Sequence, residues 1–149
     1  MSDDEMDVDQ VLTLLNAALR LQQRSALQLS LAAGGLTGLA GQALAPRLAA
    51  SAAEELGDAR RLVEKIVALG GDPTDEVAPL AWHEDALDMV GALVRQEEEA
   101  VAALHAVIPP TGQEPRSEAL EHLVEHLIMR KQGQVDMLLR VLRGAGGPA

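Results

Sequence analysis

The chain has 149 residues, the usual size of one domain and enough to bury a core without disulfides or structural metals. It contains no cysteine, which excludes disulfides, thiolate metal sites and cysteine nucleophiles, and its net charge of -11 argues against binding nucleic acid. Hydrophobic residues make up 48% of the chain and are almost all aliphatic, with one Trp and no Phe or Tyr, so we expect helices rather than strands.

The first nine residues and one uncharged stretch indicate where in the cell the protein is expected. Residues 1–9 carry five acidic side chains, the opposite of the basic start of a secretory signal, so we expect a cytoplasmic protein. Residues 25–46 carry no charge and are long enough to cross a bilayer. Their glycines and polar side chains favour a junction between two helices over a membrane span. We expect one domain over 1–149, with an acidic tail at 1–7 and a flexible tail at 144–149.

Apolar residues at helical spacing predict two helices in the first half of the chain. The first is expected over 8–33 and ends at the glycine pair 34–35. The second is expected to begin within 42–47, because Pro46 is tolerated in the first turn of a helix, and to run to Leu69. Two further glycines follow it and stop it.

The second half of the chain predicts two more helices after a long connection. Residues 70–82 include two prolines and are too many for a tight turn, so we expect a crossover rather than a hairpin. The third helix is expected over 83–108, where a Pro-Pro pair ends it, and the fourth over 115–143. The pattern therefore predicts an all-α protein, a four-helix bundle of two hairpins joined by one long crossover.

Each predicted helix has one polar residue near the middle of its apolar face, and these residues are Gln22, Glu55, Glu97 and Lys131. Asp58 follows Glu55 by three positions, on the same helix face, and Gln134 has the same relation to Lys131. Burying such groups costs several kcal/mol each unless they are paired or bound to a ligand. Their coincidence at one level of the bundle therefore marks a candidate site.

Three stretches of the sequence resemble motifs of one family. Residues 15–29, LNAALRLQQRSALQL, resemble the first-helix motif LNxxLxxExxA, and residues 54–73, EELGDARRLVEKIVALGGDP, resemble ExxHAxxxxERIxxLxGxP. Residues 83–97 are similar to the third helix of the same proteins, the bacterioferritins and the wider ferritin-like superfamily. This resemblance covers nearly the full length and implies a ferritin-like four-helix bundle with a long crossover between helices two and three.

The resemblance implies six ligand positions of a di-iron site, and they fall on Gln22, Glu55, Asp58, Glu97, Lys131 and Gln134. Only Glu55 and Glu97 match the family in residue type. The family has Glu at the positions of Gln22 and Lys131. It has His at the positions of Asp58 and Gln134. Amides and an ammonium are poor ligands for ferrous iron, so we expect no ferroxidase activity, with Glu55, Asp58 and Glu97 as remnants of a metal site.

We hypothesise that the ammonium of Lys131 stands in for the metal. Its charge would pair with Glu55 and Glu97, while the amides of Gln22 and Gln134 complete the hydrogen bonds. The alternative is that Lys131 extends to water and leaves Glu55 protonated or solvated.

A second candidate is a histidine pair in the predicted fourth helix. His122 and His126 are four residues apart, with Glu118, Glu121 and Glu125 around them, a spacing that can place two imidazoles on one metal. Their apolar neighbours Leu123, Val124, Leu127 and Ile128 form the core face of the helix, so a solvated polar stripe is favoured for the histidines and glutamates.

These observations leave two functional hypotheses. The favoured one is a non-catalytic ferritin-like protein that serves in assembly or partner binding, and the alternative is an iron-binding or iron-storage protein with atypical acidic sites. We expect no cofactor, with iron as the alternative, and no haem, because the haem-ligating methionine of bacterioferritins falls on Leu56. The resemblance implies a homo-oligomer, either a dimer through the first two helices or a larger shell. Another ferritin-like or iron-handling protein is a further candidate partner, whereas nucleic acid and membranes are not expected.

Overall fold

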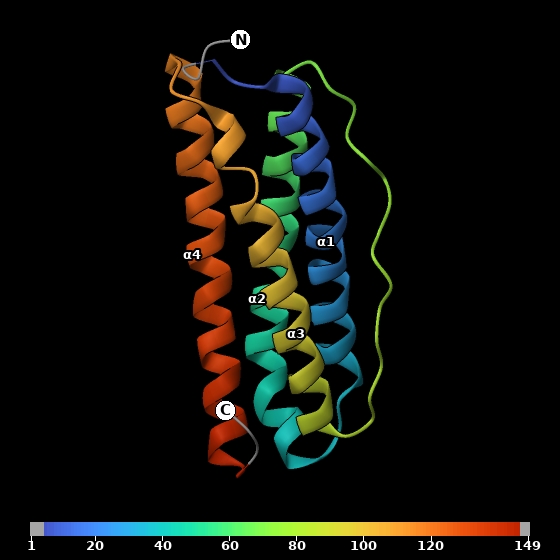
Figure 1. Cartoon of the computed structure of the whole chain (residues 1–149). Helices are drawn as coiled ribbons and strands as arrows, with labels where there is room; N and C mark the ends of the chain where they lie inside the picture. The colour runs from blue at the N-terminus through green and yellow to red at the C-terminus, as the bar shows by residue number, and fades with distance from the viewer. Residues whose placement is uncertain (1–4, 147–149) are drawn as a thin grey trace.

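The computed structural model describes residues 5–146, which form a bundle of four long α-helices with no strand (Figure 1). The elements in chain order are α1 (Val8–Gly35), α2 (Gly38–Ala68), α3 (Ala86–His105), the short 3-10 helix η1 (Pro109–Thr111) and α4 (Pro115–Gly144). Segment 69–85 runs along the outside of the bundle from the end of α2 to the start of α3. The predicted all-α four-helix bundle with a long crossover is therefore confirmed.

The start of α2 was predicted incorrectly. The helix begins at Gly38, so Pro46 lies inside it rather than in its first turn. Proline has no N–H to donate to the carbonyl of Gln42, which normally breaks a helix. Here the first turns of α2 lie at the surface, where Leu39 is 93% exposed, so water can solvate the free carbonyl.

The other helix ends differ less from the prediction. Asp85 caps α3 by accepting a hydrogen bond from the backbone N–H of Asp88, so α3 begins at Ala86. The predicted tail 144–149 lies partly outside the described residues, and its first residue, Gly144, is the last residue of α4. Residues 1–4 of the predicted acidic tail also lie outside the described range.

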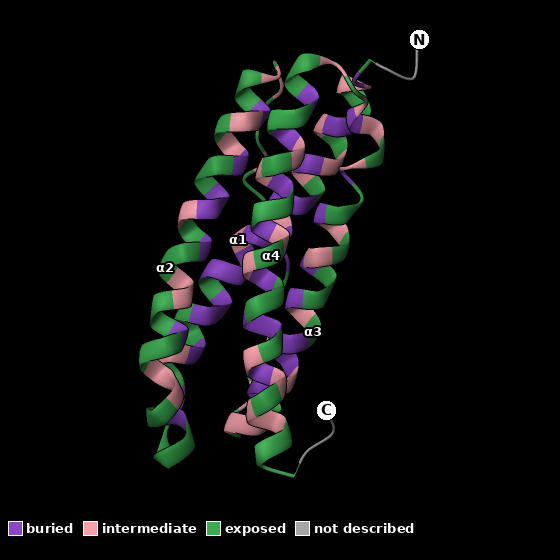
Figure 2. Cartoon of the chain, turned by 90° about the vertical axis from the view of Figure 1, so that its left-hand side faces the viewer, coloured by how far each residue is buried: buried purple, intermediate pink, exposed green. Residues whose placement is uncertain are grey.

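Most of the apolar core lies in two large clusters at different levels of the bundle, and a small third cluster, Leu21, Ala78 and Ala100, packs the crossover against α1 and α3. One cluster includes Leu15 and Leu62, and the other includes Leu29 and Leu93, with members from all four helices in each. The buried residues face inward along every helix (Figure 2). The polar positions of the candidate site lie between the two clusters in the sequence of each helix, so this polar layer divides the core.

The crossover is fastened to the bundle by amide side chains of α1. Gln28 donates to the carbonyl of Ala81 at 2.8 Å and accepts from the N–H of Ala81 at 2.7 Å. Asn16 accepts from the N–H of Thr74 at 2.8 Å in the same manner. These bonds satisfy backbone groups that a strandless connection cannot pair within itself.

The link between α1 and α2 lies within the uncharged stretch 25–46. The ring of Trp82, in the crossover, packs against this link. A Cβ added to Gly35 would lie only 2.5 Å from that ring, so the contact requires glycine. No helix within residues 5–146 combines the length and the apolar character needed to cross a membrane.

Candidate functional site

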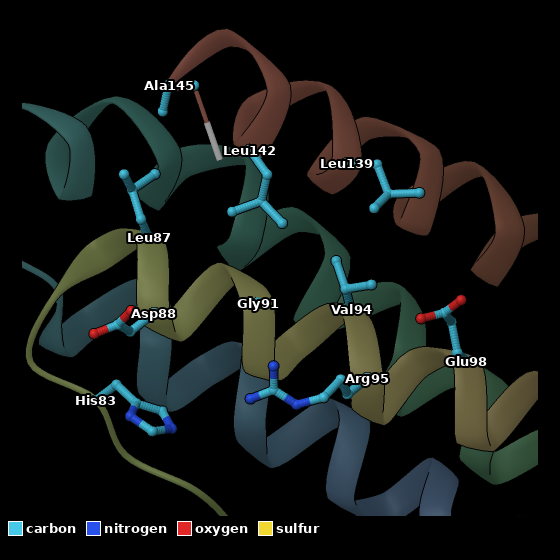
Figure 3. A pocket seen from close by; sticks show the side chains of 11 residues that line it. His83, Leu87, Asp88, Gly91, Val94, Arg95, Glu98, Leu139, Leu142 and Ala145 are labelled. Carbon is cyan, nitrogen blue, oxygen red and sulfur yellow. The ribbon is translucent and has the colours of Figure 1, made fainter. Parts of the chain in front are cut away.

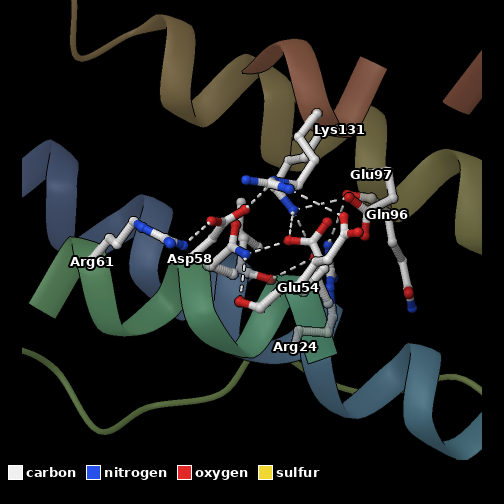
Figure 4. Close-up of polar contacts among 12 residues, drawn as sticks. Arg24, Glu54, Asp58, Arg61, Gln96, Glu97 and Lys131 are labelled. Atoms are coloured by element: carbon white, nitrogen blue, oxygen red, sulfur yellow. Dashed lines mark hydrogen bonds and ion pairs between the residues drawn. The ribbon is translucent and has the colours of Figure 1, made fainter. Parts of the chain in front are cut away.

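The ammonium of Lys131 lies at the centre of the polar layer (Figure 4). Its Nζ is 2.9 Å from Oε2 of Glu55, 2.9 Å from Oε2 of Glu97 and 3.2 Å from Oγ of Ser25. An ammonium has three protons, and all three are thereby donated. The side chain of Lys131 is only 1% exposed, so it does not extend to water.

Gln22 joins this cluster from α1. Its Nε2 donates to the backbone carbonyl of Glu55 at 2.9 Å and also contacts Oε2 of the same residue. Oε1 of Glu55 and Oε1 of Gln22 have no hydrogen-bond partner within residues 5–146. The structure thus brings Gln22, Glu55, Glu97 and Lys131 together, one residue from each helix.

The electrostatics of the cluster follow from its charges. One ammonium contacts two carboxylates, which leaves an excess of one negative charge if both are ionised. Burial raises the pKa of Glu55, assisted by the nearby charge of Glu97 and opposed by Lys131. Burial alone would lower the pKa of Lys131, but the two carboxylates outweigh it and the pKa is raised. A charged lysine beside a carboxyl that binds its proton more tightly than usual fits this arrangement.

Asp58 is buried but forms a separate set of ion pairs. Its Oδ1 is 2.8 Å from Nη1 of Arg61, and its Oδ2 is 2.9 Å from Nε of Arg130. Arg130 also reaches Glu54, with Nη1 3.2 Å from Oε2. Asp58 therefore contacts arginines rather than the ammonium of Lys131 (Figure 4).

The hydrogen bonds predicted for Gln134 are absent from the described part of the chain. Gln134 is 9% exposed, and neither its Nε2 nor its Oε1 has a partner there. Oε1 of Gln134 receives no proton from Lys131, because all three are donated to Ser25, Glu55 and Glu97. Its Nε2 does not reach the Oε1 atoms of Glu55 and Gln22, which also stay unpaired. Including Gln134 in the network was therefore wrong.

Three contributors to this region were not identified from the sequence. One is Arg61, whose position three residues after Asp58 was an available signal. Ser25 accepts from Lys131, and the available signal was its position three residues after Gln22, on the same helix face. Arg130 neutralises Asp58 from α4, which no spacing within one helix indicates, because the two residues meet only through the fold.

The histidine pair of α4 is exposed and engaged locally. Nε2 of His126 is 2.9 Å from Nη2 of Arg130, and Nε2 of His122 is 3.6 Å from Oε1 of Glu118. Across residues 5–146 there is no group of three or more His, Cys, Asp or Glu side chains placed to hold a metal ion.

A surface cavity of about 760 Å³ lies between α3 and the end of α4 (Figure 3). Leu87, Val94 and Leu142 form part of its wall, and Asp88 and Arg95 contribute charged groups. None of the site residues predicted from the sequence lines this cavity, although Glu98, the neighbour of Glu97 on α3, does. The cavity is therefore separate from the polar layer.

Comparisons with known proteins agree with this architecture. Residues 12–145 match the model of the ferritin-like domain. A ferritin-like, diiron-carboxylate protein from Bacillus anthracis strain Ames is similar, with a TM-score of 0.80 and 25% identity over 95% of this chain and 99% of the other. A bacterioferritin from Rhodobacter capsulatus, solved with a metal-free dinuclear site and haem iron, has a TM-score of 0.75 and 21% identity over 89% and 82%. No curated protein sequence matches the chain.

Proposed function

The chain belongs to the ferritin-like family, and from this premise we propose that it is a non-catalytic member that serves in assembly or partner binding. In this proposal an internal layer of ion pairs takes the place of a di-iron centre. The observation that carries it is the position of Lys131, whose ammonium is held between the carboxylates of Glu55 and Glu97.

The donor set supports the proposal because it does not fit two iron ions. A metal bridging Glu55 and Glu97 would have to displace the ammonium of Lys131, which would then be buried without a partner. Breaking a buried ion pair in this way costs about 3 to 5 kcal/mol. Asp58 is committed to two arginines, so it does not replace the missing imidazole ligand.

The alternative, iron binding through acidic side chains elsewhere, has the net charge of -11 in its favour. Acidic surfaces are common and attract cations without a defined site. The described residues offer no cluster of acidic or imidazole ligands for it, so it remains the second candidate.

Iron content and ferrous oxidation together test the proposal. The protein is purified from iron-rich medium and compared with the variant Gln22→Glu/Asp58→His/Lys131→Glu/Gln134→His, which restores the family's ligand types. We expect stoichiometric iron and oxygen-dependent oxidation only in that variant, provided that circular dichroism shows it to be helical. A pair of iron ions in each unmodified subunit, or oxidation well above buffer, would refute the proposal. Diffuse iron binding without oxidation would favour the alternative.

We further propose that the partner is a second copy of the chain, docked on the face formed by α1 and α2. Leu27 is 50% exposed, Leu31 is 41% exposed and Leu56 is 65% exposed. Leu56 lines a surface groove between the two helices, and Gln23, which also lines it, lies one turn before Leu27 on α1. Exposed apolar side chains around a groove are typical of an interaction surface.

A further inference from the structure

A surface cavity of about 590 Å³ separates α2 from α4 beside the polar layer. Arg47 and Ser51 contribute to its α2 side, and Gln134 and Met137 to its α4 side. It is distinct from the groove between α1 and α2, since the two share no lining residue.

Gln134 gives this cavity an unsatisfied polar group. The residue is nine-tenths buried, and its amide has both a donor and an acceptor without a partner within residues 5–146. Its neighbour Lys131 cannot supply a proton, because its three hydrogen bonds are made elsewhere. A buried amide in this state favours any ligand that brings one acceptor and one donor to it.

The charges around the cavity select the sign of the ligand. Arg47 is exposed, and no carboxylate of the described residues lies within ion-pair distance of it. The cavity's carboxylate, Glu54, is already paired with Arg130 at 3.2 Å. In a chain with a net charge of -11, this cavity therefore presents an uncompensated cation.

We propose that the cavity binds a small organic acid. Its carboxylate pairs with the guanidinium of Arg47, with the hydroxyl of Ser51 beside it, and a second hydrogen-bonding group meets the amide of Gln134. Met137 provides an apolar wall for the carbon skeleton. This site needs no metal, so its test does not depend on whether the polar layer binds iron.

Titration of the full chain with citrate, followed by NMR of the Gln134 side-chain amide, tests this inference. Arg47→Met and Gln134→Met remove the two recognition groups, while Arg140→Met removes an exposed arginine of α4 that does not line the cavity. Calorimetric titration gives the affinity of each variant. Circular dichroism confirms that each variant is folded.

We expect a saturable shift of the Gln134 amide resonance and an affinity that is about tenfold weaker in Arg47→Met and in Gln134→Met, with no change in Arg140→Met. No saturable shift, or an equal loss in Arg140→Met, would overturn the site. Inorganic phosphate serves as a second probe. Phosphate binding as tight as citrate binding, and insensitive to Gln134→Met, would overturn the assignment to an organic acid.

Discussion

Lys131 of α4 and Glu55 of α2 form an ion pair in which Nζ and Oε2 are 2.9 Å apart and neither side chain is more than 1% exposed. Glu97 of α3 receives the same ammonium at the same distance. Opposite charges at the centre of the bundle thus connect three helices at positions where the motif resemblance implies metal ligands.

Replacing Lys131 with Met removes the cation and leaves two buried carboxylates without it. We expect the free energy of unfolding at neutral pH to fall by about 3 to 5 kcal/mol, the usual effect of breaking a buried pair from one side. Denaturant unfolding measures this. Lys65→Met, which removes the other lysine of the chain, should change stability by no more than about 0.5 kcal/mol.

The triple variant Lys131→Met/Glu55→Gln/Glu97→Gln checks the cause of that loss. Because it removes the carboxylates together with the cation, we expect it to recover a large part of the lost stability. If the triple variant is less stable than Lys131→Met alone, unpaired charge is not the reason for the destabilisation.

The pH dependence of stability reports the proton on Glu55. Its pKa is raised above the ordinary value of 4.5, chiefly by burial, so the folded state keeps the proton to higher pH than the unfolded chain. This contribution is complete below the ordinary pKa and is lost as the pH rises through the folded pKa. A glutamine at this position keeps its neutral form at every pH.

Glu55→Gln should therefore gain stability relative to the unmodified protein as the pH is raised from about 5 to about 8. Chemical denaturation across this range gives the difference. Glu98→Gln, on the exposed side of α3, should show no such trend. A difference that moves in the opposite direction would mean that folding lowers the pKa of Glu55.

Gln28→Met should loosen the crossover. The substitution leaves the N–H and the carbonyl of the half-buried Ala81 without their partner, and we expect a loss of about 1 kcal/mol, the low end for an unpaired polar group. Trp82, the only aromatic residue of the chain, follows Ala81 directly, so its fluorescence should become more accessible to acrylamide. Gln132→Met on the exposed face of α4 is the control. Unchanged quenching and stability in Gln28→Met would show that these bonds do not hold the crossover.

Leu56→Glu should weaken self-association through α1 and α2. It places a charge on the proposed docking face at a side chain that is 65% exposed, so the isolated fold should be little affected. Light scattering coupled to size exclusion gives the molar mass. Met129→Glu, at a side chain 67% exposed on α4, should leave the mass of the assembly unchanged. A monomeric unmodified protein, or an equal effect of both variants, would contradict this docking face.

The sequence was sufficient to predict the fold because helical periodicity, glycines and prolines divide it clearly. The polar layer was also predictable, since one polar residue interrupts each apolar line. The hydrogen bonds within the layer could not be predicted. Whether Lys131 has a proton to donate to Gln134 depends on its other acceptors, and the sequence does not show that Ser25 is one of them. The pairing of Asp58 with Arg130 likewise requires the distance between α2 and α4.

The start of α2 shows a different limit. Proline is a strong signal for a helix boundary, and Pro46 was placed in a first turn for that reason. The helix extends to Gly38 because its first turns are exposed and the lost hydrogen bond can be replaced by water. Exposure of a segment is set by the packing of the whole bundle, which local sequence patterns do not report.

We propose that an ammonium, rather than a metal, holds Glu55 and Glu97 together. Its most direct test is a crystal structure of the unmodified protein soaked in ferrous iron, with anomalous data collected at the iron edge. We predict electron density for the Lys131 side chain between the two carboxylates and no anomalous peak there. Anomalous peaks between Glu55 and Glu97, with Lys131 turned away, would show that a metal displaces the ammonium and would refute the proposal.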